Sequence, residues 1–219
     1  MPAYRYKGLT PVVDPASFVH PTASLIGDVI VGPGCYIGAG ASLRGDFGRI
    51  TVVGDSSLQD NVTVHSSPAA EVVVGRGSTI AHGAILHGCI LGENTLVGMN
   101  AVVLDNAEIG SECLVAALSL VKADSQIPER SLVVGNPAKV VKTFEERQVT
   151  WRNNGLGEYQ ELARKSLVDF TECAPLPAPE PDRPRIESNA IAVRLKGPAA
   201  EARERRMAAE LNTQDGEVV

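Results

Sequence analysis

An aliphatic residue returns at every sixth position through most of the first 133 residues of the chain. Three series joined by nine-residue steps share this spacing: Val13, Val19, Leu25, Val31, Ile37 and Leu43; then Val52, Leu58 and Val64; then Val73, Thr79, Ile85, Leu91, Val97, Val103, Ile109, Val115, Val121, Ile127 and Val133. Thr79 is the one exception to the aliphatic rule. An α-helix repeats every 3.6 residues and a flat strand every two, so neither produces this period. A six-residue step is typical of a parallel β-helix, and the chain is long enough for roughly seven coils.

Mostly small residues stand four positions after these aliphatics, where a coil has to turn a tight corner. They are Ser17, Ala23, Val29, Cys35, Ala41, Cys89, Thr95, Ala101, Ala107, Cys113, Ser119, Ser125 and Ser131. Three of the four cysteines belong to this series, so we expect them to pack as small apolar side chains in the corners. The sequence has no CxxC pair, which favours reduced thiols over disulfides or a cysteine-type zinc site.

The hexad pattern ends at Asn136-Pro137, which predicts a β-helix domain over residues 1–137. In residues 138–173, apolar residues recur at three- and four-residue spacing from Val140 to Trp151 and from Glu158 to Phe170. This spacing predicts two α-helices packed on the β-helix.

Residues 174–219 form the predicted third part of the chain. It begins with the proline-rich segment from Ala174 to Pro184, which is typical of an extended linker. The residues that follow mix acidic and basic side chains, and we expect a tail that is mobile or packs on a neighbouring subunit.

The charge balance disfavours a nucleic-acid partner. The 219 residues carry 26 acidic and 20 basic side chains, which gives a formal net charge of −6, whereas nucleic-acid affinity rests mostly on cationic groups. The longest uncharged stretch, from Val29 to Leu43, contains four glycines and is too short and too polar to span a membrane. The first residues do not resemble a secretory signal, so we expect a cytoplasmic protein.

Three of the four histidines, His65, His82 and His87, fall within 23 residues. Neutral imidazoles are the commonest zinc ligands, and a catalytic zinc takes three protein ligands and keeps a fourth position open. This concentration of histidines therefore predicts a metal site, while solvated turn residues are the simpler interpretation of each histidine taken alone. His20 precedes a proline and is interpreted as structural.

Counting hexads places His65 and His87 on the same edge of the β-helix, one coil apart, at an axial separation of about 4.8 Å. His82 falls on the preceding face, and one side of six residues can span up to about 20 Å. A closed three-fold assembly would bring His82 of one subunit against His65 and His87 of the next. We therefore predict three equivalent metal sites at the interfaces of a homotrimer.

The residues around these histidines resemble the gamma-class carbonic anhydrase-like family of hexapeptide-repeat proteins. The resemblance rests on LRGDFGRI at residues 43–50, QDNVTVH at residues 59–65 and AHGAILHGC at residues 81–89. The segments GLTPVV, SFVHPTA and GMNAVV extend it over residues 1–170, towards the group of phenylacetic acid degradation protein Y and carnitine-operon protein E. It implies a left-handed β-helix, a trimer, and zinc, with iron or cobalt as alternatives, bound by three interfacial histidines.

The resemblance also implies roles for five other residues. Arg44 and Asp46 would form the salt-bridge network that locks adjacent subunits, and Asp60 would join it; arginine suits this role because it binds carboxylates through two nitrogens. Gln59 would orient the water on the metal or a substrate oxygen, and Tyr159 loosely matches a family tyrosine near the metal. We assign Gln59, Asp60 and Tyr159 to the catalytic group. The simpler interpretations are a solvated surface pair for the arginine and its carboxylate, a turn residue for Gln59 and ordinary helix packing for Tyr159.

Three departures from the family pattern bear on the reaction. Phe47 and Pro68 stand where the archetypal gamma-class anhydrase has glutamates, and Ser57 stands where it has asparagine. Rapid CO2 hydration needs a carboxylate that moves protons away from the metal-bound water. The departures therefore disfavour fast anhydrase activity.

The resemblance implies instead a metal-dependent hydrolase of phenylacetate catabolism. Metal-bound hydroxide would cleave a ring-derived acyl-coenzyme A thioester, a small-molecule substrate. Carbonic anhydrase activity, a hexapeptide acyltransferase and a non-catalytic scaffold remain as alternatives. The acyltransferase would stay active when metal is chelated, and the scaffold would bind zinc without turnover.

Overall fold

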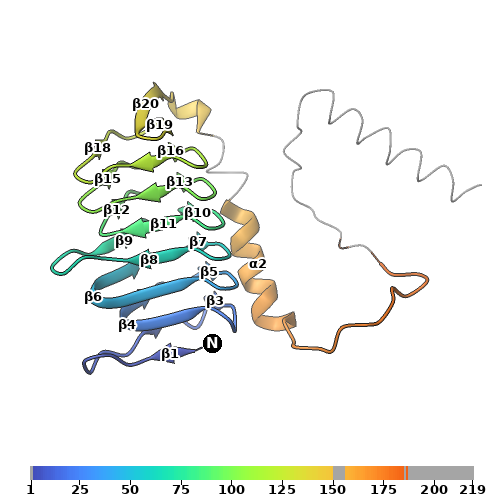
Figure 1. The fold of residues 1–219 in the computed structure, drawn as a ribbon. Coiled ribbons are helices and arrows are strands. Elements are labelled where there is room, and N and C mark those ends of the chain that lie inside the picture. The colour runs from blue at the N-terminus through green and yellow to red at the C-terminus, as the bar shows by residue number, and fades with distance from the viewer. Residues whose placement is uncertain (1, 150–155, 185, 187–219) are drawn as a thin grey trace, which may run out of the picture. The chain divides into compact units, whose positions relative to one another are not determined.

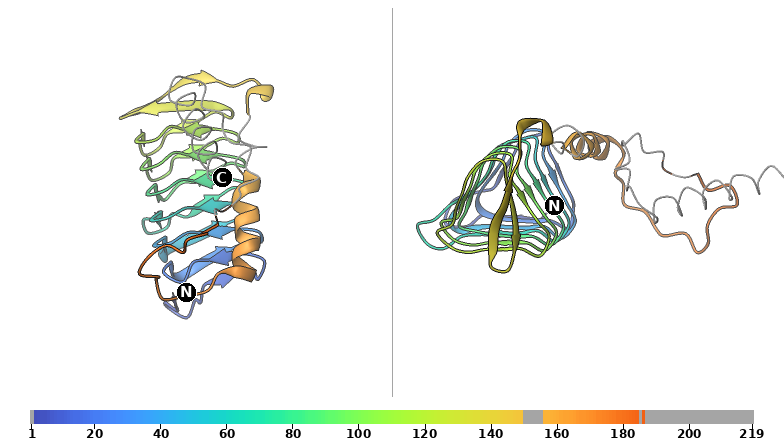
Figure 2. Two further views of the ribbon diagram at one scale, coloured as in Figure 1. Left: turned by 90° about the vertical axis from the view of Figure 1, so that its right-hand side faces the viewer. Right: turned by 90° about the horizontal axis from the view of Figure 1, so that it is seen from above.

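The computed structural model describes residues 2–149, 156–184 and 186. Residues up to Pro175 form one compact unit, which is a parallel β-helix with three faces and a triangular cross-section (Figures 1 and 2). The first face stacks one parallel strand from each of seven coils, as the six-residue period predicts. These strands are β3 (Phe18–Val19), β5 (Tyr36–Ile37), β7 (Ser57–Leu58), β10 (Thr79–Ile80), β13 (Leu96–Val97), β16 (Leu114–Val115) and β19 (Ser131–Gly135).

The other two faces share the long strands β4 (Ser24–Val31) and β6 (Ser42–Val52), which bend around the edge between them. The second face also contains β1 (Ala3–Tyr4), β8 (Thr63–His65), β11 (Ile85–His87), β14 (Val102–Val103) and β17 (Leu120–Val121). The third face also contains β2 (Val12–Val13), β9 (Val72–Val74), β12 (Ile90–Leu91), β15 (Glu108–Ile109) and β18 (Gln126–Ile127).

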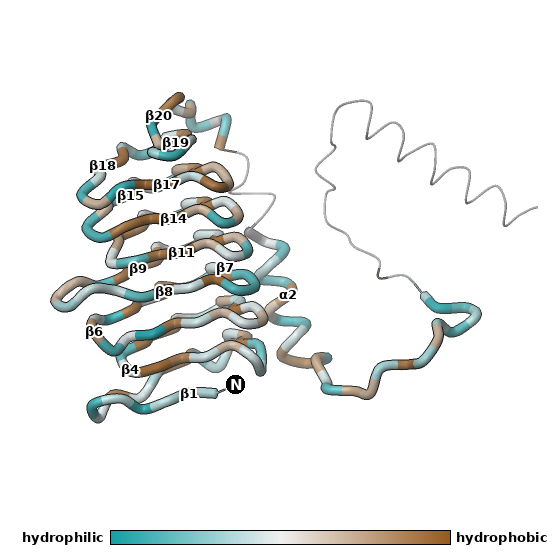
Figure 3. The backbone as a smooth tube through the Cα atoms, viewed as in Figure 1, coloured by the Kyte–Doolittle hydropathy of each residue, from teal (hydrophilic) through white to brown (hydrophobic). Residues whose placement is uncertain are grey.

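A column of aliphatic side chains fills the centre of the β-helix. Its largest fully buried members are Leu25, Ile37, Leu43, Ile50, Leu58, Ile80, Leu86 and Leu91. Apolar segments follow the strands, while the bends between strands are more hydrophilic (Figure 3). Burying one such side chain contributes about 1.5–3 kcal/mol, so this column is the main source of stability.

The structure corrects the phase of the hexad pattern over residues 73–85. The fully buried aliphatic residues here are Val74, Ile80 and Leu86, each one position after the residue that the pattern places inside. Ile85, which the pattern places inside, is 40% exposed. The corner at Gly88 is one residue shorter than the others, which brings the chain back into phase at Leu91. The exception at Thr79 is thereby explained, because Ile80 takes the inward position.

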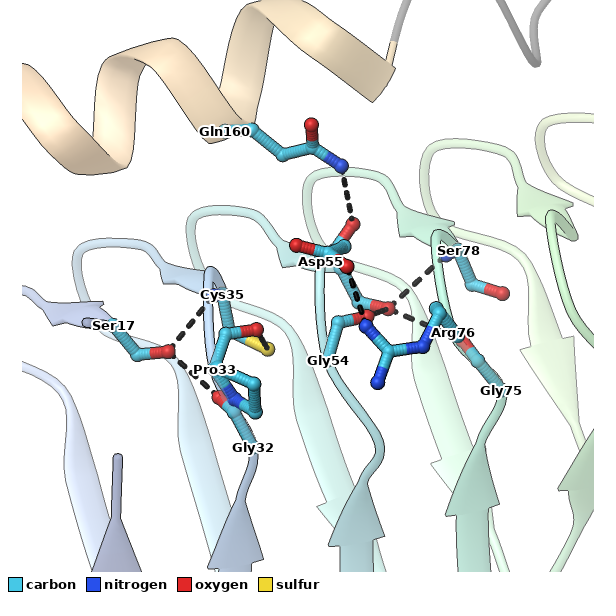
Figure 4. A network of polar contacts seen from close by, with 11 residues as sticks. Ser17, Gly32, Pro33, Cys35, Gly54, Asp55, Gly75, Arg76, Ser78 and Gln160 are labelled. Atoms are coloured by element: carbon cyan, nitrogen blue, oxygen red, sulfur yellow. Dashed lines mark hydrogen bonds and ion pairs between the residues drawn. The ribbon is translucent and has the colours of Figure 1, made fainter. Parts of the chain in front are cut away.

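The small corner residues also connect one coil to the next. Ser17 Oγ donates a hydrogen bond to Gly32 O (2.7 Å) and accepts one from the Cys35 N–H (2.8 Å), as Figure 4 shows. Ser56 Oγ repeats the pattern, donating to Gly75 O (3.1 Å) and accepting from the Ser78 N–H (3.0 Å). Backbone groups that the tight turn leaves without a strand partner are satisfied in this way.

The predicted helix from Val140 to Trp151 is wrong over its first residues. Residues Ala138–Thr143 form strand β20, which pairs antiparallel with β19 after the turn at Asn136-Pro137. The strand forms because β19 ends the stack of coils and would otherwise expose a row of unpaired backbone groups. A 3-10 helix, η1 (Glu146–Gln148), follows, and residues 150–155 lie outside the described part of the chain.

The second predicted helix is confirmed as α2 (Leu156–Asp169), which packs along the first face against β3, β5 and β7 (Figure 1). Ala163 of this helix is fully buried. The Tyr159 ring lies 5.4 Å from that of Tyr36, and Gln160 Nε2 donates to Asp55 O at 3.2 Å (Figure 4). The N-terminal part of the helix is therefore tied to β5 and to the corner at Asp55.

Residues beyond Pro175 belong to a second unit, of which residues 176–184 and 186 are described. They contain turns and bends without a regular helix or strand. The predicted mobile tail lies almost entirely outside the described residues. No described helix is long and apolar enough to cross a membrane.

Candidate metal centre

Two insertions interrupt the edge between the second and third faces. β6 has more residues between Gly45 and Ile50 than β4 has between Gly27 and Val29, and residues 66–71 leave the prism between β8 and β9. A loop protrudes from the triangular section at this edge (Figure 2). We call this edge of the β-helix the insertion edge. It comprises residues 44–49, His65, residues 66–71, His87 and Asp105.

Strands β8 and β11 bring His65 and His87 side by side on this edge. The two residues are partners in the strand register, which confirms the placement that the hexad count predicts. His65 Nδ1 lies 3.2 Å from His87 Nε2, and the ring centroids are 5.2 Å apart. The side chains are only 12% and 30% exposed, so one chain alone already shields the pair.

The outer nitrogen of each ring lies against a carboxylate. His65 Nε2 is 3.0 Å from Asp46 Oδ1, and His87 Nδ1 is 2.8 Å from Asp105 Oδ2. An ionised carboxylate only accepts hydrogen bonds, so the outer nitrogens carry the ring protons. In neutral rings, the two inner nitrogens then face each other with their lone pairs, an arrangement that a cation between them would stabilise.

The geometry of this pair fits a tetrahedral metal. Two nitrogen ligands at about 2.0–2.1 Å from a tetrahedral zinc lie about 3.3 Å apart, close to the separation of the two inner nitrogens. Histidines that bind metal usually donate their other N–H to a carboxylate, as both histidines do here. Imidazole nitrogen also suits iron, and the same donors could hold it.

Arg44 and Asp46 form an ion pair, with Arg44 Nη1 2.7 Å from Asp46 Oδ2. The network between adjacent subunits stays a prediction. The pair lies within one chain, directly behind His65. Burial acts to raise the pKa of Asp46, but the hydrogen bonds from Arg44 and His65 outweigh it and hold the pKa below its ordinary value. Asp46 therefore stays ionised and keeps the proton on His65 Nε2.

Asp105 is the residue of this edge that the sequence patterns did not single out. Its other carboxylate oxygen, Oδ1, accepts a hydrogen bond from Ser67 Oγ at 2.8 Å. Burial acts to raise the pKa of Asp105, but the hydrogen bonds from Ser67 and His87 lower it overall. The available signal was its position 18 residues after His87, which is one coil of the repeat.

His82 lies on a different edge, between the first and second faces. Its Nδ1 is 3.2 Å from Asp60 Oδ2, and both side chains are nearly half exposed, at 43% and 45%. Asp60 Oδ1 accepts a hydrogen bond from the Ala39 N–H at 2.9 Å. Gln59, the residue before Asp60, is buried. We call this the His82 edge. Asp60 therefore does not join Arg44 and Asp46 within a chain, because the residues belong to different edges.

Tyr159 reaches the His82 edge from α2. Burial, together with the nearby Tyr36, Asp60 and Glu158, raises the pKa of Tyr159. Burial and Asp60 likewise raise the pKa of Tyr36. Of the three residues assigned to the catalytic group, Asp60 contacts His82 and Gln59 precedes Asp60 in the chain. Tyr159 lies near enough to Asp60 for that carboxylate to act on its pKa, so the three belong to the His82 edge rather than to the insertion edge.

Within one chain, no group of three or more His, Cys, Asp or Glu side chains among the described residues could hold a metal ion. One chain provides two converging imidazoles at the insertion edge and a third imidazole at the His82 edge.

Comparisons with known proteins identify the relatives of this chain. The family described as bacterial transferase hexapeptide, with six repeats, matches residues 88–123. Carnitine operon protein CaiE of Salmonella agona is 47% identical over 187 residues, which cover 85% of this chain and 94% of that protein. The chain belongs to the CaiE family of hexapeptide-repeat proteins. CaiE of Escherichia coli K12 is 46% identical over 187 residues, with 85% and 95% covered. The predicted membership of the carnitine-operon group is confirmed.

Two solved structures share this fold with the CaiE family. A hexapeptide transferase family protein from Anaplasma phagocytophilum is 34% identical, with a TM-score of 0.71 over 74% of this chain and 96% of that one. A Bacillus cereus protein named as an acetyltransferase is 30% identical, with a TM-score of 0.73 over 75% and 96%.

Proposed function

We propose that this CaiE-family protein is a metal-dependent acyl-coenzyme A thioesterase whose active sites lie between the subunits of a homotrimer. The observation that carries the proposal is the 3.2 Å approach of two imidazole nitrogens, each backed by a carboxylate. His65 and His87 of one subunit and His82 of the next would hold zinc, or else iron or cobalt.

A divalent metal with an open coordination position activates water at neutral pH and polarises the carbonyl that it contacts. The chain's own residues prepare this site. Asp46 and Asp105 keep the ring protons on the outer nitrogens, which leaves the inner lone pairs of His65 and His87 free. Arg44 keeps Asp46 ionised by pairing with its second oxygen.

The His82 edge of the neighbouring subunit would complete the site. Asp60 beside His82 Nδ1 leaves Nε2 of that ring available as the third ligand. Gln59 would orient the attacking water or the thioester oxygen. The phenol of Tyr159, whose pKa is raised by burial and by its neighbours, would stay protonated and could donate a hydrogen bond to the developing oxyanion.

Phe47 favours a thioester with an apolar acyl group over CO2. Its side chain is 53% exposed, and its ring lies 5.4 Å from that of His65. An apolar ring beside the metal cannot accept protons, whereas the glutamate expected at this position in an anhydrase could. The same ring could contact a ring-derived acyl group of phenylacetate catabolism, or attract the quaternary ammonium of a carnitine-derived one.

The proposal can be tested on the full-length protein. We expect a trimer with close to one metal per chain, and hydrolysis of some member of a panel of ring-derived, carnitine-derived and short acyl-coenzyme A thioesters. Chelation should abolish the activity and added zinc should restore it, with CO2 hydration measured alongside. A monomer that binds metal with full occupancy would contradict the interfacial site, and bound zinc without turnover would indicate a scaffold.

An acyltransferase is a second candidate, because the Bacillus cereus protein that is 30% identical to this chain is named as an acetyltransferase. In that case coenzyme A release would require an amine or hydroxyl acceptor and would survive chelation. The thioesterase needs no acceptor and loses its activity on chelation, so the same panel separates the two.

A further inference from the structure

Asp105 connects His87 to a loop that is remote in sequence. Its Oδ2 lies 2.8 Å from His87 Nδ1, and its Oδ1 accepts the 2.8 Å hydrogen bond from Ser67 Oγ. Ser67 belongs to the inserted residues 66–71 and stands 38 positions before Asp105. Both oxygens of the carboxylate are thus engaged, so its plane cannot rotate freely.

The backbone of the short corner leaves room for this carboxylate. A Cβ atom at Gly88 would lie 2.5 Å from Asp105 Oδ1, closer than real Cβ contacts allow. Gly88 also has a φ of +57°, which favours glycine. Because Gly88 has no side chain, the Asp105 carboxylate can lie beside the residue that follows His87.

The two insertions pack closely enough to hold Ser67 in place. A Cβ at Gly48, in the bend of β6, would lie 1.8 Å from Ala70 O and 2.7 Å from Ser66 Oγ. Ser66 itself is fully buried. The loop that carries Ser67 thus rests directly on the bend that carries Asp46 and Phe47, and its position is restrained.

We propose that Asp105 is a positioning residue for His87, held by Ser67 and admitted by Gly88, which fixes the ring with its Nε2 facing His65. The inference rests on the proposed metal function and deepens it. Removing a carboxylate partner of a metal-binding histidine typically weakens metal affinity about 10- to 100-fold. The inserted loop 66–71 then has a purpose, because it delivers the hydroxyl that orients this carboxylate.

The first measurement uses the protein without metal. Imidazole nitrogen NMR on histidine-labelled protein has only four histidines to assign. In the wild type we expect the His87 proton on Nδ1. In Asp105→Ala the tautomer should shift towards Nε2–H, the form favoured by free histidine, and Asp105→Asn should give an intermediate result.

The second measurement is zinc affinity, by competition with a chromophoric chelator. We expect a 10- to 100-fold loss in Asp105→Ala, a smaller loss in Asp105→Asn and the smallest in Ser67→Ala. Asp124→Asn is the matched control for Asp105→Asn: Asp124 lies one coil further on and accepts a hydrogen bond from Asn106 Nδ2 at 3.1 Å. It should bind zinc as the wild type does.

The outcomes separate the two proposals. An Asp105→Ala protein with an unchanged tautomer and zinc affinity within twofold of the wild type would overturn the role of Asp105 and leave the metal site standing. A wild type that binds no zinc would overturn the proposed function, and the tautomer of His87 would still decide the role of Asp105. If Asp105→Ala does not fold, Asp105→Asn and Ser67→Ala provide both readouts.

Discussion

The insertion edge and the His82 edge both pair histidine with aspartate, but one chain completes them to different degrees. At the insertion edge, His65 is 12% exposed, and its partner Asp46 is also held by Arg44. At the His82 edge, His82 is 43% exposed and Asp60 is 45% exposed. The difference follows the insertions: where residues were added to β6, the side chains of Asp46 and Phe47 lie against His65. The regular corner leaves His82 open to a neighbouring subunit.

The largest effect should come from removing the exposed partner. His82→Ala should lose the bound metal and reduce thioester hydrolysis by at least about a hundredfold, since a metal supplies several kcal/mol of stabilisation to the reaction. Metal analysis and the thioesterase assay check this. His20→Ala is the control, because His20 bonds Thr22 three coils away from His82 along the same edge.

Mixing subunits tests whether the edges act across chains. His82→Ala and His65→Ala are each inactive alone, but a trimer that contains both has some interfaces with all three histidines intact. Random assortment in an equal mixture should restore about one quarter of the sites. No recovery from refolded mixtures, despite demonstrated subunit exchange, would place all three ligands within one chain.

A substitution at the insertion edge should change selectivity rather than metal binding. Phe47→Glu should lower kcat/KM for ring-containing thioesters by roughly tenfold, because it removes an apolar contact, and should raise CO2 hydration by supplying a proton acceptor. Phe47→Leu should keep most of the thioesterase activity. Unchanged selectivity in Phe47→Glu would mean that the substrate does not contact this ring.

Alkaline pH should weaken the His82 edge through Tyr36 and Tyr159. Burial, together with the nearby Asp60, raises the pKa of both phenols above the ordinary 10.0. The stability that the protonated phenols contribute is fully present below pH 10 and is lost as pH rises through the folded-state pKa. Tyr36→Phe should therefore show a smaller fall in Tm between pH 9 and pH 11 than the wild type. Tyr4→Phe, at an exposed tyrosine, should behave as the wild type does.

The smallest effect concerns the rigidity of the insertion edge. Cys89, two residues after His87, is fully buried, and burial raises its pKa to about 12, so it should resist thiol reagents at neutral pH. The exposed Cys173 should react at once and provides the internal reference. Labelling followed by peptide mapping checks both. Rapid labelling of Cys89 in the folded protein would show that the insertion edge opens.

Part of the candidate site could be predicted because the fixed length of the repeat assigns each residue a coil and a face of the β-helix. The hexad count alone placed His65 next to His87 on one edge and His82 away from them, on the preceding face. The count failed by one residue between residues 73 and 85, because the step from Val64 to the next inward residue, Val74, is one residue longer than the pattern suggests. The shortened corner at Gly88 cancels this difference by Leu91 and leaves no gap in the pattern. The helix expected from Val140 became strand β20, because the unpaired edge of β19 outweighs a weak local preference.

The sequence by itself determined the β-helix, its seven coils and the level at which the histidines sit. Inward aliphatics and small corner residues act within each coil, so a local pattern is enough to specify them. Only the tertiary structure decided which carboxylates meet the histidines. Asp105 and Ser67 are 38 residues apart and belong to different coils, and they meet because an inserted loop folds back over a corner that lacks a side chain. Contacts of that kind depend on where whole segments lie, and no period in the sequence records them.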